Sequence, residues 1–178
     1  MSTPLFVHVL EDMNEAEITI SRSSPSYRFD VSSPALPATQ AEPVALDEAA
    51  IEEVDAFIND KSQPIVMFAL QWCEFCWSVR NMLAKYEIEF VSVDIDSVQH
   101  DEGNKGQKFR EVIHDKTTWN TFPQIFIEGE FIGGCTDIFD QCKDGSLAKR
   151  LDELDLPFNP TVKDDPYSFL PKWLQSLK

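Results

Sequence analysis

The hydrophobic pattern of the chain changes at residue 47, where helical and strand periods begin to alternate. One helical face carries four apolar side chains, Ile51, Val54, Phe57 and Ile58. Asp47 precedes them in the place of an N-cap, because its carboxylate can accept N–H groups of a first helical turn. The run PIVMFAL at 64–70 is short, continuously apolar and begins with proline. This pattern predicts a helix followed by a strand buried on both faces in the middle of a sheet.

A second helix and a second strand are expected after the buried run. Apolar residues recur at a helical spacing in Cys76, Val79, Met82, Leu83 and Tyr86. Residues 91–96 then alternate between apolar and polar, which is typical of a strand with one wetter face. A polar loop leads to a further helix around 107–114. Up to this point the order of elements is β-α-β-α.

The pattern from residue 123 onward predicts a hairpin and two short helices. In PQIFIEGEFIGG, two apolar runs flank the tripeptide EGE, which is a hairpin signal. One helix is expected to end near Gly145, and the next to carry Leu147, Leu151 and Leu154 on one face. The complete order predicts an α/β fold in which helices flank a mixed four-stranded sheet.

Both ends of the chain differ from this central part. Residues 1–46 hold five of the eleven prolines and no glycine, so we expect an irregular extension with room for short strands, ending in a linker near 33–46. Residues 157–178 hold four prolines, which exclude a long helix. Four aromatic side chains of this tail favour packing onto the central part over contact with a partner: Phe158, Tyr167, Phe169 and Trp173.

Composition and charge narrow the classes of partner and location. A length of 178 residues with 43% hydrophobic residues suits one globular domain with extensions. The net charge of −16 argues against nucleic acid and anionic membranes as partners. No apolar run approaches the roughly 20 residues that a membrane span needs. The first residues show neither the basic region of a secretory signal nor the arginines of a transit peptide, which predicts a cytoplasmic location.

Two cysteines, Cys73 and Cys76, follow the buried run directly. Residues three apart at a helix start bring their Cβ atoms to roughly 5 Å, so such a pair can form and open a disulfide. The first sulfur faces the unpaired N–H groups and the positive end of the helix dipole, which favour thiolate over thiol. Cys73 is therefore expected to be a nucleophile and Cys76 a resolving thiol.

Other interpretations of the cysteine pair are less well supported. A permanent disulfide is disfavoured in a reducing compartment. A zinc site needs two more ligands, but Cys135 and Cys142 are separated by six residues and the histidines are scattered at 8, 100 and 114, so no metal site is predicted. Two small buried hydrophobes are the remaining alternative, at an unusual place in the chain.

Three separated motifs resemble those of the glutaredoxin family. They are CEFC at 73–76, TFP at 121–123 and GGCTD at 133–137, in the order and at the spacing of that family. The resemblance covers residues 47–156 and leaves both ends of the chain outside it. It implies a thioredoxin-like fold and a glutathione-dependent thiol–disulfide oxidoreductase that acts on glutathione mixed disulfides and on protein disulfides. Its partners would be glutathione and glutathionylated or disulfide-containing proteins.

The resemblance also implies roles for particular residues. Cys73 and Cys76 would be catalytic. Pro123 would follow a cis peptide bond and place the Phe122 backbone beside the cysteine of glutathione, and Asp137 would meet the ammonium of the γ-glutamyl end. The helix expected to begin near Thr136 would hold the γ-glutamyl carboxylate. The complete implied glutathione-binding set is Thr121, Phe122, Pro123, Gly134, Cys135, Thr136 and Asp137.

The sequence departs from the family pattern next to the first cysteine. Leu70 replaces a lysine common in the family, and Glu74 and Phe75 replace a proline and a tyrosine, so weaker support of the thiolate is expected. Members that lack this proline suggest an alternative function, a [2Fe–2S] carrier or sensor in which Cys73 and glutathione from each of two subunits hold the cluster. The protein is then a dimer, and otherwise a monomer. A third hypothesis is an inactive adaptor.

Overall fold

The computed structural model describes residues 45–175. The short strands predicted for the N-terminal extension fall at 5–31 and lie outside the described residues. The described part is the structure of the central domain and most of the C-terminal tail.

A mixed four-stranded sheet forms the middle of the domain. Its strands are β1 (Ile65–Ala69), β2 (Val91–Asp94), β3 (Gln124–Ile127) and β4 (Glu130–Gly133), in the order β2-β1-β3-β4. β1 pairs with β2 in parallel and with β3 in antiparallel, and β3 and β4 form an antiparallel hairpin. The predicted mixed sheet, with the first strand at its centre and a hairpin at its edge, is confirmed.

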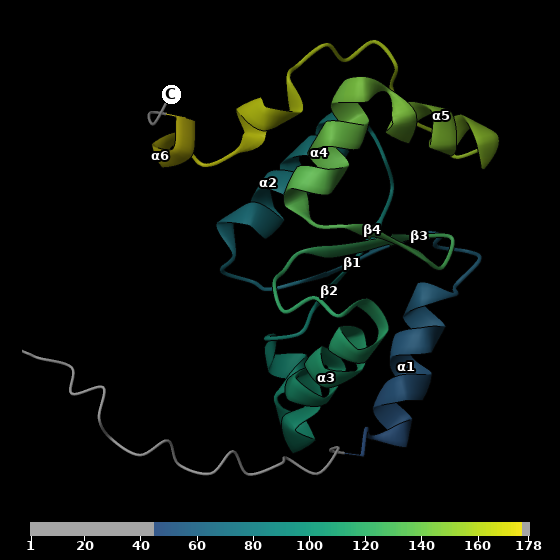
Figure 1. Ribbon diagram of the computed structural model, residues 1–178, viewed down its shortest axis with the longest axis vertical. Helices are drawn as coiled ribbons and strands as arrows, with labels where there is room; N and C mark the ends of the chain where they lie inside the picture. Colours follow the sequence, from purple (N-terminus) through teal and green to yellow (C-terminus); the bar gives the residue numbers. More distant parts are fainter. Residues whose placement is uncertain (1–44, 176–178) are drawn as a thin grey trace, which may run out of the picture. The chain divides into compact units, whose positions relative to one another are not determined.

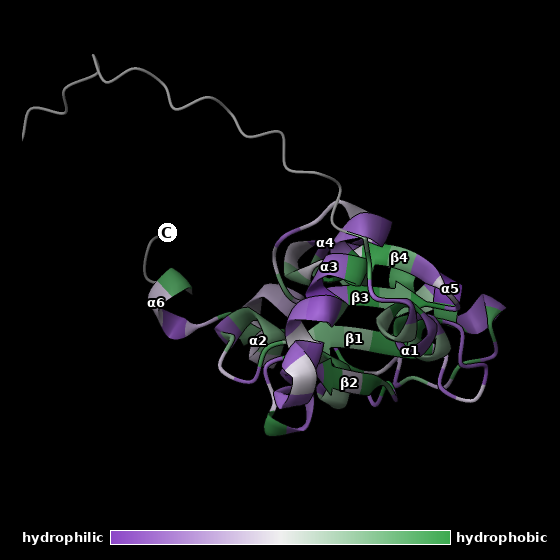
Figure 2. Ribbon diagram, turned by 90° about the horizontal axis from the view of Figure 1, so that it is seen from below, coloured by the Kyte–Doolittle hydropathy of each residue, from purple (hydrophilic) through white to green (hydrophobic). Residues whose placement is uncertain are grey.

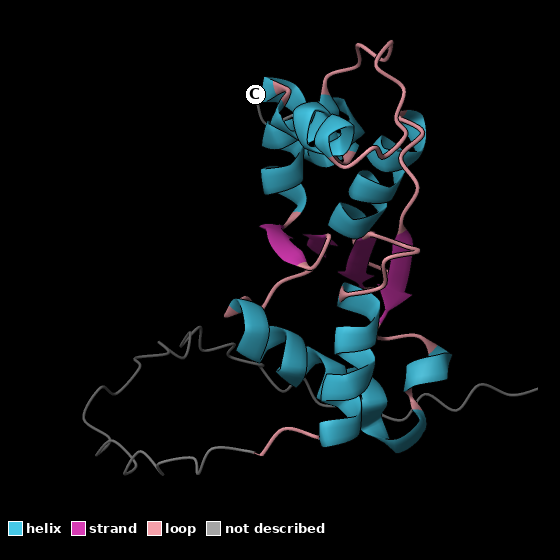
Figure 3. Ribbon diagram, turned by 90° about the vertical axis from the view of Figure 1, so that its right-hand side faces the viewer, coloured by secondary structure: helices cyan, strands magenta, loops and turns pink. Residues whose placement is uncertain are grey.

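Helices cover both faces of the sheet (Figures 1 and 3). One layer holds α2 (Glu74–Lys85), α4 (Cys135–Asp144) and α5 (Ser146–Glu153), and the other holds α1 (Glu48–Ile58) and α3 (Lys105–Thr117). Asp47 caps α1 as expected, since its carboxylate accepts the Ala50 N–H at 3.0 Å. The predicted helix around 107–114 is three residues longer at its C-terminal end and two at its N-terminal end.

The central strand divides the core into two apolar layers. All five side chains of β1 are buried, and they point alternately to opposite faces of the sheet. Ile65, Met67 and Ala69 pack under α2 and α4, and Val66 and Phe68 pack against α1 and α3. Figure 2 shows mainly apolar residues along the strands, whereas apolar and polar residues alternate along the helices. The continuous apolar run is thus explained by burial on both faces.

Two expectations for individual residues need correction. Ile95 was expected within the second strand, but β2 ends at Asp94; Ile95 is still buried and donates its N–H to the Ala69 carbonyl at 3.0 Å. Leu154 was expected on the apolar face of α5, but that helix ends at Glu153 and the Leu154 side chain is 36% exposed. Short 3-10 turns, η1 (Val98–His100) and η2 (Glu102–Asn104), connect β2 to α3. None of the helices within 45–175 is long and apolar enough to cross a membrane.

The C-terminal tail packs back onto the layer of α2 and α4. It contains the short helices η3 (Pro166–Phe169) and α6 (Lys172–Gln175). Phe158, Tyr167 and Phe169 contact the core beneath, and the Tyr167 hydroxyl donates to Asp140 at 2.6 Å. Packing onto the domain is therefore correct for three of the four tail aromatics. Trp173 is the exception, because its side chain is 53% exposed.

Candidate functional site

Cys73 lies at the junction of the central strand and α2, where it is the N-cap residue of the helix. Its Sγ accepts the Cys76 N–H at 3.3 Å, so one unpaired donor of the first helical turn points at the sulfur. The Sγ–H donates to the Phe122 carbonyl at 3.7 Å. Cys73 is half-buried, and all four cysteines are free thiols. The predicted position at the helix start is confirmed.

Cys76 lies one turn further along α2 and is fully buried. Burial raises the pKa of its thiol to about 12, and the neighbouring Cys73 adds to this increase. At neutral pH the Cys76 thiol is therefore protonated. Cys73 is half-buried and Cys76 is buried, which is the difference in exposure expected between a nucleophile and a resolving thiol. The two roles themselves stay predictions.

A pocket of about 460 Å³ opens beside Cys73. All seven residues predicted to bind glutathione are part of its lining: Thr121, Phe122, Pro123, Gly134, Cys135, Thr136 and Asp137. The Phe122–Pro123 peptide bond is cis, as expected. Residues from two distant motifs thus line one pocket. Cys73 is not part of the lining, but its Sγ lies 3.7 Å from the carbonyl oxygen of Phe122, which is.

The two glycines of the GGCTD motif are needed for the shape of this pocket. Gly133 has φ +121°, and a Cβ there would lie 2.6 Å from atoms of Asp137. A Cβ on Gly134 would lie 3.1 Å from the Trp119 ring and 3.3 Å from the Pro123 carbonyl oxygen. A side chain at position 134 would therefore require the Trp119 ring and the Pro123 carbonyl to move by a few tenths of an ångström.

The N-terminus of α4 faces the same pocket. The helix begins at Cys135, one residue before the predicted start, and Gly134 is its N-cap. Glycine has no side chain to accept the first N–H groups of the helix, so these donors remain available to an anion. Asp137 accepts the Gly134 N–H at 2.8 Å and lines the pocket next to them. A carboxylate and an ammonium group on one ligand can both be satisfied here.

Arg110 is a pocket residue that the sequence did not indicate. It lies on α3, and its guanidinium is 4.8 Å from the centre of the Phe122 ring. Among the described residues that line the pocket, it carries the only positive charge. Leu70, which replaces the family's lysine, lines the same pocket. No signal in the chain could have found Arg110, because an arginine on the polar side of a helix is ordinary.

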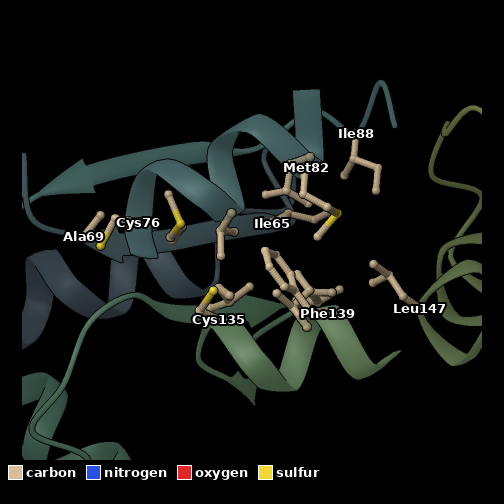
Figure 4. Close-up of a cluster of buried hydrophobic side chains, with 14 of the residues drawn as sticks. Ile65, Ala69, Cys76, Met82, Ile88, Cys135, Phe139 and Leu147 are labelled. Atoms are coloured by element: carbon tan, nitrogen blue, oxygen red, sulfur yellow. The ribbon is translucent and has the colours of Figure 1, made fainter. Parts of the chain in front are cut away.

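The remaining cysteines lie outside any metal-binding cluster in the structure. Cys135 is buried near Cys76 at one end of the apolar layer (Figure 4), and burial raises its pKa to about 12, with Cys73 and Asp137 contributing. Cys142 is half-buried, and burial raises the pKa of its thiol. Within residues 45–175 there is no group of three or more His, Cys, Asp or Glu side chains that could hold a metal ion.

Comparisons with known proteins identify the family. The glutaredoxin family model matches residues 65–132. Glutaredoxin-C4, chloroplastic, from Oryza sativa subsp. japonica is 31% identical over 150 residues, which cover 84% of this chain and all of that protein. The chain belongs to the glutaredoxin family. Glutaredoxin-2 from Schizosaccharomyces pombe is 30% identical over 93 residues, or 52% of this chain and 80% of that protein.

Solved glutaredoxin structures share the fold. The crystal structure of wheat glutaredoxin matches with a TM-score of 0.54 and 28% identity, over 61% of this chain and 96% of that one. The crystal structure of a buckwheat glutaredoxin–glutathione complex matches with a TM-score of 0.52 and 25% identity, over 59% of this chain and 89% of that one. The thioredoxin-like fold predicted for this glutaredoxin is thus confirmed.

Proposed function

We propose that this glutaredoxin is a glutathione-dependent thiol–disulfide oxidoreductase that reduces glutathione mixed disulfides, with protein disulfides as further substrates. The observation that supports the proposal most is the charge pattern of the pocket beside Cys73. The positive charge of Arg110 comes from α3. The negative charge of Asp137 and the free N–H groups come from the first turn of α4, which also lines the pocket. Membership of the family and the glutathione complex of the buckwheat relative add to this support.

Glutathione carries two carboxylates and one ammonium group, and the pocket offers a partner for each. Arg110 would bind the glycyl carboxylate, in place of the lysine that Leu70 replaces. The N–H groups at the start of α4 would bind the γ-glutamyl carboxylate, and Asp137 the ammonium. The backbone of Phe122, whose carbonyl already lies 3.7 Å from the Cys73 sulfur, would pair with the cysteine of the tripeptide.

The reaction with a mixed disulfide follows from this placement. The Cys73 thiolate attacks the glutathione sulfur, the disulfide bond to the protein breaks, and the protein leaves as a thiolate that takes up a proton. A second glutathione thiolate then attacks the glutathione sulfur on Cys73. This step releases oxidised glutathione and restores the Cys73 thiolate. One substrate disulfide is reduced for each glutathione disulfide formed.

Cys76 would act only on protein disulfides. There, Cys73 forms a mixed disulfide with the substrate, and Cys76 attacks Cys73 to release the reduced protein and leave a Cys73–Cys76 disulfide. Because the Cys76 pKa is raised to about 12, this attack needs a base that takes the proton, and the departing substrate thiolate can serve. We further propose a monomer in the cytoplasm as the working form.

Two cysteine variants test the proposal with a small substrate, the mixed disulfide of glutathione and 2-mercaptoethanol. Cys73→Ser should abolish turnover, because no other described thiol combines partial exposure with a place beside the pocket. Cys76→Ser should retain most of the turnover, because the second cysteine takes no part in this reaction. Equal losses in both variants, or activity in Cys73→Ser, would overturn the assignment.

A further inference from the structure

The surface beside Cys73 and outside the glutathione pocket carries an unusual group of exposed indoles. Trp72, Trp77 and Trp173 are 90%, 52% and 53% exposed. Trp72 precedes the nucleophile in the chain, Trp77 lies on the first turns of α2, and Trp173 lies on α6. Large aromatic side chains seldom stay this exposed together without a binding role. We call these three side chains and Glu74 the indole surface.

Two of the three indoles are held in place by hydrogen bonds through their ring N–H groups. Trp173 donates to the Glu74 carboxylate at 2.7 Å, across 99 positions of sequence. Trp77 donates to the Gln71 carbonyl at 2.8 Å. Both ring N–H groups are therefore engaged, and the Arg80 guanidinium lies over the Trp77 ring, 5.2 Å from its centre. The parts of the rings that stay exposed are apolar surface that a ligand can contact.

The tail that carries Trp173 is attached to the domain at several points. Asp165 caps η3 and lies 3.7 Å from Lys143, and the Tyr86 hydroxyl donates to the Asp164 carbonyl at 3.0 Å. Phe169 and Leu170 pack onto the core. Figures 1 and 2 show α6 to one side of α2, and the bond between Trp173 and Glu74 links it to the first turn of that helix. The C-terminal tail, which packs onto the domain, therefore places Trp173 next to Glu74, the residue that follows Cys73.

The charge of this surface favours a basic ligand. Glu74 is exposed and accepts the Trp173 ring N–H, and Asp96 accepts the Gln71 N–H at 2.8 Å in the adjoining loop. Arg80, which lies 5.2 Å from the Trp77 ring, is paired with Asp94. Lys172 works against the attraction, but the whole chain carries a net charge of −16. Guanidinium groups bind both carboxylates and the faces of indole rings.

We propose that the indole surface docks the polypeptide of a protein substrate and selects target cysteines flanked by arginine. This inference rests on the proposed function, because glutathione fills the pocket and the protein that carries it must then cross the surface outside. Trp173 and Glu74 act as specificity-determining residues. They contact the flanking side chains of the substrate and take no part in the transfer between sulfurs.

Three S-glutathionylated peptides test the inference. Their sequences are identical except for the residues that flank the cysteine, which are arginine in the first peptide, serine in the second and glutamate in the third. The wild type should turn over the arginine peptide with a kcat/KM about 10-fold above that of the glutamate peptide at low salt, and the ratio should shrink in 0.5 M NaCl because exposed charges are screened. Ratios between peptides are compared, since they cancel any effect of Glu74 on the nucleophile.

Four variants divide the surface into its parts. Trp173→Ala should lower the arginine-to-serine ratio about threefold, and Trp173→Phe, which keeps a ring but loses the bond to Glu74, should lower it less. Glu74→Gln keeps an oxygen acceptor for Trp173 but removes the charge, and should also lower the ratio about threefold. Glu52→Gln on α1, in the other helical layer, is the matched control and should leave it unchanged.

The outcomes separate this inference from the proposed function. Turnover of the small mixed disulfide reports the proposed function alone and should be unaffected in both Trp173 variants. If the wild type does not turn over the small mixed disulfide, the inference is tested by binding alone. The affinities of the three peptides for Cys73→Ser are then measured by fluorescence anisotropy, and the ratios between these affinities replace the ratios of kcat/KM. The inference is overturned if the variants change kcat/KM equally for all three peptides, which would make the tail a lid. It is also overturned if the wild type shows no preference among the peptides, or if the protein is a dimer that Trp173→Ala dissociates.

Discussion

Arg110 offers the sharpest test of the proposal that the pocket binds glutathione. Its guanidinium stacks on Phe122, lines the pocket and carries the only positive charge among the described lining residues. If it binds the glycyl carboxylate, Arg110→Gln removes one charge-assisted hydrogen bond and leaves a side chain of similar reach. Folding should be little affected, because the side chain is half-buried at the edge of the domain.

The size of the effect follows from how far Arg110 is shielded. A hydrogen bond to a charged group contributes about 1.5–3 kcal/mol, and an exposed ion pair about 0.2–1 kcal/mol. Arg110 lies between these limits, because Phe122 covers one face of its guanidinium. We expect Arg110→Gln to lower kcat/KM for the glutathione mixed disulfide about 10-fold, which corresponds to about 1.4 kcal/mol.

The assay is steady-state turnover of a small mixed disulfide whose glutathione carries either a free glycyl carboxylate or its neutral monoethyl ester. Unmodified glutathione is the reductant in both cases. The wild type should lose about 10-fold with the ester, and Arg110→Gln should show little further loss. Lys149→Gln on α5 removes the same charge outside the pocket and serves as the control. Independent, additive losses from the variant and the ester would refute the contact.

Two further predictions concern the cysteines. Because the pKa values of Cys76 and Cys135 are raised to about 12 from 9.0, the folded state holds these protons more tightly than the unfolded state, so the free energy of unfolding should fall as pH rises from about 9 toward 12. Urea unfolding under reducing conditions should show a slope up to about 1.4 kcal/mol per pH unit shallower in Cys135→Ala than in the wild type, and parallel curves would contradict the burial argument. Cluster binding, the alternative function, would use the Cys73 thiolate as a ligand; purification without air should then give a brown dimer that Cys73→Ser does not form, whereas a colourless monomer after anaerobic reconstitution removes that alternative.

Local patterns were sufficient for the elements that position Cys73. The apolar run of β1 and the helical spacing after it depend on neighbours within a few residues, and so does the cap of α1 by Asp47. The mixed sheet and the central place of β1 followed from the hairpin signal, the βαβ arrangement and the continuously apolar run. These features could be predicted because the spacing of apolar residues along the sequence shows which side chains of a helix or strand are buried.

Features that depend on how distant elements meet could not be predicted. Arg110 belongs to the pocket because α3 and the loop before β3 come together, and no spacing in the chain expresses that contact. The bond between Trp173 and Glu74 joins residues 99 positions apart. The aromatics of the tail indicated that it packs onto the domain, but not that Trp173 would stay exposed. Leu154 was misplaced because its helix ends one residue earlier than its period suggested.

The central claim is that Cys73 receives glutathione from the neighbouring pocket, and mass spectrometry of Cys76→Ser after brief exposure to oxidised glutathione tests it most directly. We predict one glutathionyl group per chain, on the peptide that contains Cys73, and slower modification when Arg110→Gln is added. Glutathione attached to Cys135 or Cys142 at a similar rate, or an unmodified Cys73, would contradict the account.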